Sequence, residues 1–141
     1  MSREIKFRAW LKNIEKMVEP WSINLEKQRI LFNEPSDEQW TEVRIVSFDD
    51  IELLQYTCLK DKNGVEIYEG DIVIYKYQND DLKTKKLTVF FDEEDCSFSL
   101  AHKGKPYISM EKDDIKYYKV IGNIYENKEL LENATKSSTN D

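Results

Sequence analysis

The sequence predicts a mainly β fold of the β-rich α+β kind, on two observations. The dominant spacing of apolar residues is two, as in residues 5–11, IKFRAWL, where alternate side chains fall on opposite faces of an extended strand. The four glycines and three prolines, apart from Gly122, lie at or beside the turns between such segments. Short strands with frequent turns are typical of a small barrel, a meander or a sandwich.

Residues 1–50 are expected to form an N-terminal β-rich subdomain. In its first strand, residues 5–11, the side chains of Ile5, Phe7 and Leu11 share the inner face with Ala9, and Trp10 falls on the opposite face. Further segments are predicted as follows: strands at 17–19, 28–32 and 40–48, a loop at 33–37, and a short helical turn at 49–54 that is a candidate hinge.

Residues 51–126 are expected to form a second, barrel-like domain that begins with a hairpin. Asn63-Gly64 lies between two extended segments, and this dipeptide favours a type I′ turn, in which both central residues have a positive φ. Gly70 and Asp71 predict a second tight turn, which leads into a strand at 72–77. We therefore interpret Asn63, Gly64, Gly70 and Asp71 as structural turn residues.

The remaining segments complete a meander and a short C-terminal helix. Strands are predicted at 87–91, 97–102, 107–110 and 115–125. Gly122 inside the last strand indicates a bulge or a close backbone crossing. Residues 127–141 are expected to hold a helix at 128–134, capped by Asn127, and then a disordered polar tail.

Three segments resemble a known family. REIKFRAW near the start, LQYTCLKDKNGVEIYEGDIV in the middle and VIGNIYEN near the end are similar to the YopX-like proteins of phages and prophages. The resemblance implies a β-rich fold and a phage or prophage origin, and it implies no reaction. Cys58 stands where the family pattern usually carries glycine. The middle segment also resembles the Gly-Asp turns of Src-homology-3-like small barrels, an analogy of fold alone.

Charge and composition narrow the function classes. The chain has 28 acidic and 21 basic residues, a net charge of −7, which disfavours non-specific binding to nucleic acids or anionic membranes. No segment reaches transmembrane length, and the start, MSREIKFRAWLK, lacks the apolar region of a signal peptide. Cys58 and Cys96 have no C-x-x-C spacing, so we expect a cytoplasmic protein with reduced thiols.

The sequence shows no set of residues typical of a catalytic site. We therefore expect that the protein is not an enzyme and that it binds no cofactor or metal. His102 is the only histidine, and no serine or cysteine motif points to it. The acidic segment 92–95 lacks the spacing of a calcium loop and is interpreted as a hairpin turn. The glycines of residues 63–75 match no phosphate-binding motif.

Three binding hypotheses remain open. The first is a phage or prophage accessory protein that is a homo-oligomer or binds a host protein, with Trp10, Trp21 and Trp40 as candidate interface anchors. The second is a nucleic-acid-binding barrel, whose patch would contain Lys83, Lys85, Lys86, Tyr75 and Tyr77. The third is an acidic inhibitor of a host DNA-binding or defence protein, based on the net charge.

Overall fold

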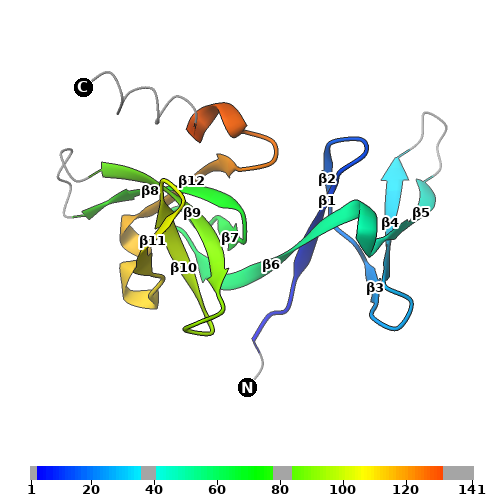
Figure 1. Ribbon diagram of the computed structural model, residues 1–141, viewed down its shortest axis with the longest axis horizontal. Coiled ribbons are helices and arrows are strands. Elements are labelled where there is room, and N and C mark those ends of the chain that lie inside the picture. The colour runs from blue at the N-terminus through cyan, green and yellow to red at the C-terminus, as the bar shows by residue number, and fades with distance from the viewer. Residues whose placement is uncertain (1–2, 36–40, 78–83, 132–141) are drawn as a thin grey trace. The chain divides into compact units, whose positions relative to one another are not determined.

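The computed structural model describes residues 3–35, 41–77 and 84–131 (Figure 1). The chain divides into two compact units, an N-terminal unit of Lys6–Gln55 and a larger unit that combines residues 1–5 with residues 56–141. The long strand β6 (Ile51–Lys60) begins in the N-terminal unit and ends in the larger one. The predicted mainly β fold is confirmed.

Two antiparallel sheets build the N-terminal unit. The first half of β6 pairs with β1 (Phe7–Leu11), which pairs with β2 (Lys16–Val18). The second sheet has the order β3 (Ser22–Asn24), β4 (Arg29–Pro35), β5 (Thr41–Ser47), and the short 3-10 helix η1 (Phe48–Asp50) links β5 to β6. Buried side chains from both sheets form one core: Ala9, Leu11, Val18, Ile30, Phe32 and Ile51.

Three expectations for the N-terminal unit are wrong. In the predicted loop at 33–37, residues 33–35 are instead the end of β4, because Asn33 and Pro35 pair with residues of β5, and residues 36 and 37 lie outside the described residues. The helical turn at 49–54 ends at Asp50, since pairing with β1 outweighs the helix propensity of the leucines that follow. Ile5 is 65% exposed and precedes β1, so it does not share the buried face.

A five-stranded antiparallel sheet, curled into a half-barrel, dominates the larger unit. The strand order of this sheet is β11 (Lys105–Ser109), β10 (Ser97–His102), β9 (Thr84–Asp92), β8 (Asp71–Lys76) and β12 (Tyr118–Asn123). Outside this sheet, β7 (Glu66–Tyr68) pairs with the second half of β6. The strand expected from 115 begins only at Tyr118, because the 3-10 helix η4 (Lys112–Tyr117) precedes it. Core side chains lie on the concave face: Ile67, Val73, Leu87, Val89, Leu100 and Tyr118.

Asp61, a residue that the sequence patterns did not single out, organises the hairpin at Asn63-Gly64. Its Oδ1 accepts hydrogen bonds from the N–H groups of Asn63 (2.8 Å) and Val65 (2.9 Å), and its Oδ2 accepts one from Val120 (2.9 Å) on β12. Of the two residues Asn63 and Gly64, only Gly64 has a positive φ, so the expected type I′ turn is wrong. The Gly64 N–H donates to the Asp61 carbonyl, which gives a three-residue loop closed by a left-handed glycine.

The second turn of the same segment is held in a similar way. The buried Asp71 carboxylate accepts the N–H of Tyr68 at 2.8 Å. Gly70 has φ +84°, its N–H donates to the Val89 carbonyl and its carbonyl accepts from Ile124. Both turns therefore connect the hairpin to strands distant in sequence.

Near the C-terminal end, a bulge between Val120 and Gly122 confirms the irregularity predicted at this glycine. The predicted helix begins at 128, and its described part is 128–131. Asn127 lies directly before this helix: its carbonyl accepts the N–H of Leu130 at 3.0 Å, and its Oδ1 accepts the N–H of Asn123 at 3.1 Å. A Cβ at Gly122 would lie on the Asn127 side chain, so this position requires glycine.

Cys58 occupies a backbone conformation that favours glycine, with φ +70°. It lies in an irregular part of β6, where Thr57 Oγ1 donates to the Ile67 carbonyl and accepts from the Leu59 N–H. We expect Cys58→Gly to be about 1 kcal/mol more stable than Cys58→Ala, since both lose the thiol and only glycine relieves the left-handed strain. Urea denaturation of the two variants measures the difference, and equal midpoints would contradict this explanation.

Candidate functional site

The outer face of the β3-β4-β5 sheet carries exposed apolar side chains. Val43 and Ile45 of β5 are 55% and 58% exposed and lie opposite Asn33 and Leu31 of β4. Trp21 is 58% exposed, and its Nε1 donates to Asn33 Oδ1 at 3.1 Å, which places the indole beside the same face. Clustered exposed side chains of this kind mark interaction surfaces more often than scattered ones do.

A groove of about 460 Å³ runs beside β5 within the same unit. Leu11, Phe32 and Val46, which belong to the core or pack against it, also line the groove. Ile14, in the turn between β1 and β2, lines it as well and is itself exposed. The groove is therefore a continuation of the core that opens at the outermost strand of the sheet.

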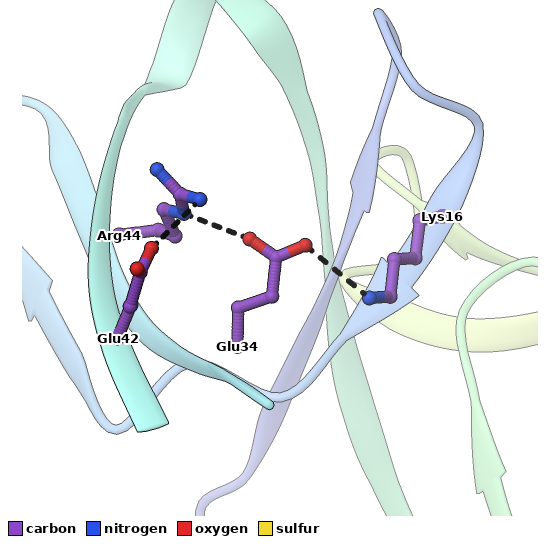
Figure 2. A network of polar contacts seen from close by, with 4 residues as sticks. All are labelled: Lys16, Glu34, Glu42 and Arg44. Carbon is purple, nitrogen blue, oxygen red and sulfur yellow. Dashed lines mark hydrogen bonds and ion pairs between the residues drawn. The ribbon is translucent and has the colours of Figure 1, made fainter. Parts of the chain in front are cut away.

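Figure 2 shows four charged side chains from β2, β4 and β5 that form one network. Arg44 Nε donates to Glu34 Oε2 at 2.7 Å, and Arg44 Nη2 lies 2.9 Å from Glu42 Oε2. Lys16 Nζ lies 3.8 Å from the other oxygen of Glu34. The hydrogen bond from Arg44 to Glu34, with the charge of Glu42, raises the pKa of Arg44. Glu34 and Arg44 line the groove, so its wall is charged and its base apolar.

The three tryptophans proposed as interface anchors are not equivalent. Trp21 lies beside the outer face described above, whereas Trp10 on β1 is half-buried and sits between Met17 and Glu52 of the neighbouring strands. Trp40 lies outside the described residues. Val43 and Ile45 were missed as site residues because alternation in the sequence does not reveal which face of a strand is buried.

The candidate nucleic-acid patch is divided by the sheet. Tyr75 and Lys85 are paired neighbours on β8 and β9, on the concave face, and Tyr77 stacks on Tyr75 with ring centroids 6.4 Å apart. Lys86 points to the opposite face, where its Nζ donates to the Leu130 carbonyl. Lys83 lies outside the described residues. Three side chains missing from the predicted patch join it: Tyr107, Tyr117 and Lys116.

Burial changes the acidity of this cluster. Desolvation raises the pKa of Tyr75, and the nearby charge of Asp114 adds to the effect. His102, whose ring contacts Tyr107, has a lowered pKa because of burial and of the charges on Lys85 and Lys103. Because the His102 imidazole and the tyrosine hydroxyls of this cluster are uncharged near neutral pH, the surface is aromatic and its positive charges come from the lysines at its border.

The buried Tyr118 beneath this cluster leads to a pH prediction. Its hydroxyl has no hydrogen-bond partner in the described structure, although the backbone of Glu111 lies near it, and desolvation raises its pKa to about 12. An unfolded tyrosine ionises near pH 10, so this residue's contribution to stability is complete below pH 10 and is lost as the pH rises towards 12. We expect Tyr118→Phe to remove about 1.4 kcal/mol of this alkaline loss between pH 8 and pH 11, while changing stability little at pH 7.

Denaturant titrations of wild type and Tyr118→Phe at pH 8 and near pH 11 test this expectation. Parallel loss of stability in both proteins would contradict the assignment to Tyr118. The half-buried Tyr117 provides a matched control, because Tyr117→Phe removes a hydroxyl from the same cluster outside the core.

The remaining candidate groups have structural explanations. Asp92 Oδ1 accepts the N–H groups of Glu94 and Asp95, so the acidic segment 92–95 forms a hydrogen-bonded turn. Cys58 and Cys96 are both exposed free thiols. Within residues 3–35, 41–77 and 84–131, no cluster of three potential metal ligands is present. No helix in these segments has the length and apolarity to cross a membrane.

Comparison with known proteins decides the family. The model of the YopX protein family matches residues 6–132, which is most of the chain. The chain belongs to the YopX family. Among solved structures, this YopX-family protein is similar to the crystal structure of protein EF1440 from Enterococcus faecalis, with a TM-score of 0.60 and 29% identity over 92% of this chain and 99% of that one. None of the curated proteins is significantly similar to it.

Proposed function

We propose that this YopX-family protein is a non-enzymatic accessory protein of a phage or prophage, that it works in the host cytoplasm by binding, and that it is a homo-oligomer. The observation that supports this best is the exposed apolar face of the N-terminal unit, where Trp21, Val43 and Ile45 lie on the side of the sheet away from the core. Exposed aromatic and β-branched side chains on a sheet are typical of protein interfaces.

The molar mass in solution tests the homo-oligomer. Sedimentation equilibrium of the wild type is expected to give a mass above the 16.8 kDa of one chain. Val43→Asp/Ile45→Asp is expected to return the protein to a monomer, because the introduced carboxylates of the two copies would lie close together where the copies meet. Leu25→Asp is the control, since Leu25 is exposed in the same unit outside strands β3 and β4. A wild type that stays monomeric overturns the homo-oligomer.

The aromatic cluster of the larger unit supports nucleic-acid binding as a second candidate function. Tyr77 and Tyr107 are exposed, and Lys85 and Lys116 lie over the rings of Tyr107 and Tyr117. Exposed rings bordered by lysines can stack on bases, and the lysines can neutralise phosphates.

Fluorescence anisotropy with labelled single-stranded DNA and RNA at low salt tests this candidate function. Lys85→Glu/Lys116→Glu should abolish binding, whereas Lys119→Glu, on the other face of β12, should not. No binding by the wild type removes this candidate.

A further inference from the structure

Strand β5 is the edge of its sheet, and within the described residues its backbone groups on one side pair with no other strand. The sheet order β3-β4-β5 places it at the end. The Trp21 N–H donates to the Leu31 carbonyl, so the backbone of Leu31 points to β3, and the Phe48 N–H donates to the Gln28 carbonyl. Backbone groups alternate along an antiparallel strand, so even-numbered residues of β4 bond to β5. The residues of β5 whose N–H and C=O point to the free edge are therefore Thr41, Val43 and Ile45, with Ser47.

The charges of β5 favour one register of this edge with a copy of itself over the two neighbouring registers. An antiparallel two-fold pairing centred on Val43 places Glu42 of each copy opposite Arg44 of the other. Shifting the centre to Arg44 brings two guanidinium groups together, and shifting it to Glu42 brings two carboxylates together. Like charges directly opposite destabilise a strand pair, and opposite charges stabilise it.

The backbone agrees with this register. Val43 directs its N–H and C=O to the free edge, so Val43 pairs with Val43 of the second copy through two hydrogen bonds. Thr41 then pairs with Ile45. Glu42 and Arg44 fall at the closely spaced, non-hydrogen-bonded positions, where opposed side chains approach most. Backbone geometry therefore permits this register, and charge favours it over the two neighbouring ones.

We infer that two copies of this chain join through β5, in antiparallel register centred on Val43, to form one continuous six-stranded sheet. This inference rests on the proposed homo-oligomer and specifies its interface. The outer apolar faces of the two copies become one surface, and the second copy's Glu42 and Arg44 approach the groove beside β5, which Arg44 and Asp50 line. A two-fold contact uses each edge once, so the assembly closes as a dimer and does not extend into a fibre.

Disulfide trapping tests the register directly. In a Cys58→Ser/Cys96→Ser background, which removes both exposed thiols, Val43→Cys is expected to oxidise to a covalent dimer. The two Cα atoms would be about 5.5 Å apart, within disulfide range. Ile45→Cys is the matched control, because Ile45 faces Thr41 and its own copy lies about 13 Å away along the strand. Thr41→Cys combined with Ile45→Cys should again cross-link.

Charge reversal provides an independent measurement. Glu42→Arg and Arg44→Glu should each weaken the dimer at least about tenfold in sedimentation equilibrium, because two favourable pairs become two repulsive ones. The double reversal should restore the affinity to within a few-fold. Circular dichroism melts identify any variant that fails to fold, and for such a variant the cysteine series alone decides.

The outcomes separate this inference from the proposed function. A dimeric wild type with cross-linking at Val43 and none at Ile45 supports the register. An oligomeric wild type in which Val43→Cys fails to cross-link, or Ile45→Cys cross-links equally well, overturns the register and leaves the homo-oligomer in place. A wild type of 16.8 kDa at all concentrations overturns both; the charges of β5 would then protect an edge from pairing.

Discussion

Replacement of Asp61 by alanine is expected to lower the free energy of unfolding by about 3–5 kcal/mol. The buried carboxylate accepts three backbone hydrogen bonds, from Asn63, Val65 and Val120. Truncation leaves these donors without their acceptor, and the hairpin loses one of its connections to β12. A charged acceptor makes each bond stronger than a neutral one.

Asp92→Ala is the matched control for this measurement. Asp92 also accepts two backbone N–H groups in a hairpin turn, but these bonds are solvent-exposed. Water can replace its carboxylate, so we expect a loss of at most about 1 kcal/mol. Guanidinium denaturation of both variants gives the two values, and similar losses would show that the connection to β12 contributes nothing.

The second large effect is expected at Gly70. Gly70→Ala should destabilise the protein by about 2–4 kcal/mol, because the position has φ +84° and a Cβ would lie 2.9 Å from Cε2 of Tyr125. Gly64 has nearly the same φ, +82°, and no atom lies within 4 Å of the position that an added Cβ would occupy. Gly64→Ala should therefore cost only the backbone strain, about 1 kcal/mol.

The difference between the two glycine variants measures the close approach of Tyr125 to Gly70. Thermal unfolding followed by circular dichroism is sufficient, since about 1 kcal/mol shifts the midpoint of a domain of this size by several degrees. If Gly64→Ala destabilises as much as Gly70→Ala, backbone conformation alone explains both. Restoration of stability by a smaller residue at position 125 in the Gly70→Ala background would confirm the steric cause.

Local patterns predicted the strands and turns well, and tertiary contacts account for the errors. Alternation located β1, β8 and β10 to within two residues. The helical turn at 49–54 failed because Leu53 and Leu54 pair with β1, a strand some forty residues away that no local pattern reveals. Asp61 was overlooked for a similar reason, since one of its three partners is Val120.

The candidate interface was only partly accessible to sequence reasoning. Trp21 was named because tryptophan is a favoured interface anchor, whereas Val43 and Ile45 look like ordinary strand residues until β4 and the core show which face they occupy. The relation between Glu42 and Arg44 across a two-fold axis appears only once β5 is known to be an edge. The division of the lysine patch likewise depends on which side of β9 each lysine takes.

Sedimentation equilibrium of the unmodified protein over a wide concentration range tests the central claim most directly. If the protein associates with itself, its mass should rise from 16.8 kDa towards twice that value as the concentration increases. A mass that remains at 16.8 kDa throughout would contradict self-association through the N-terminal unit.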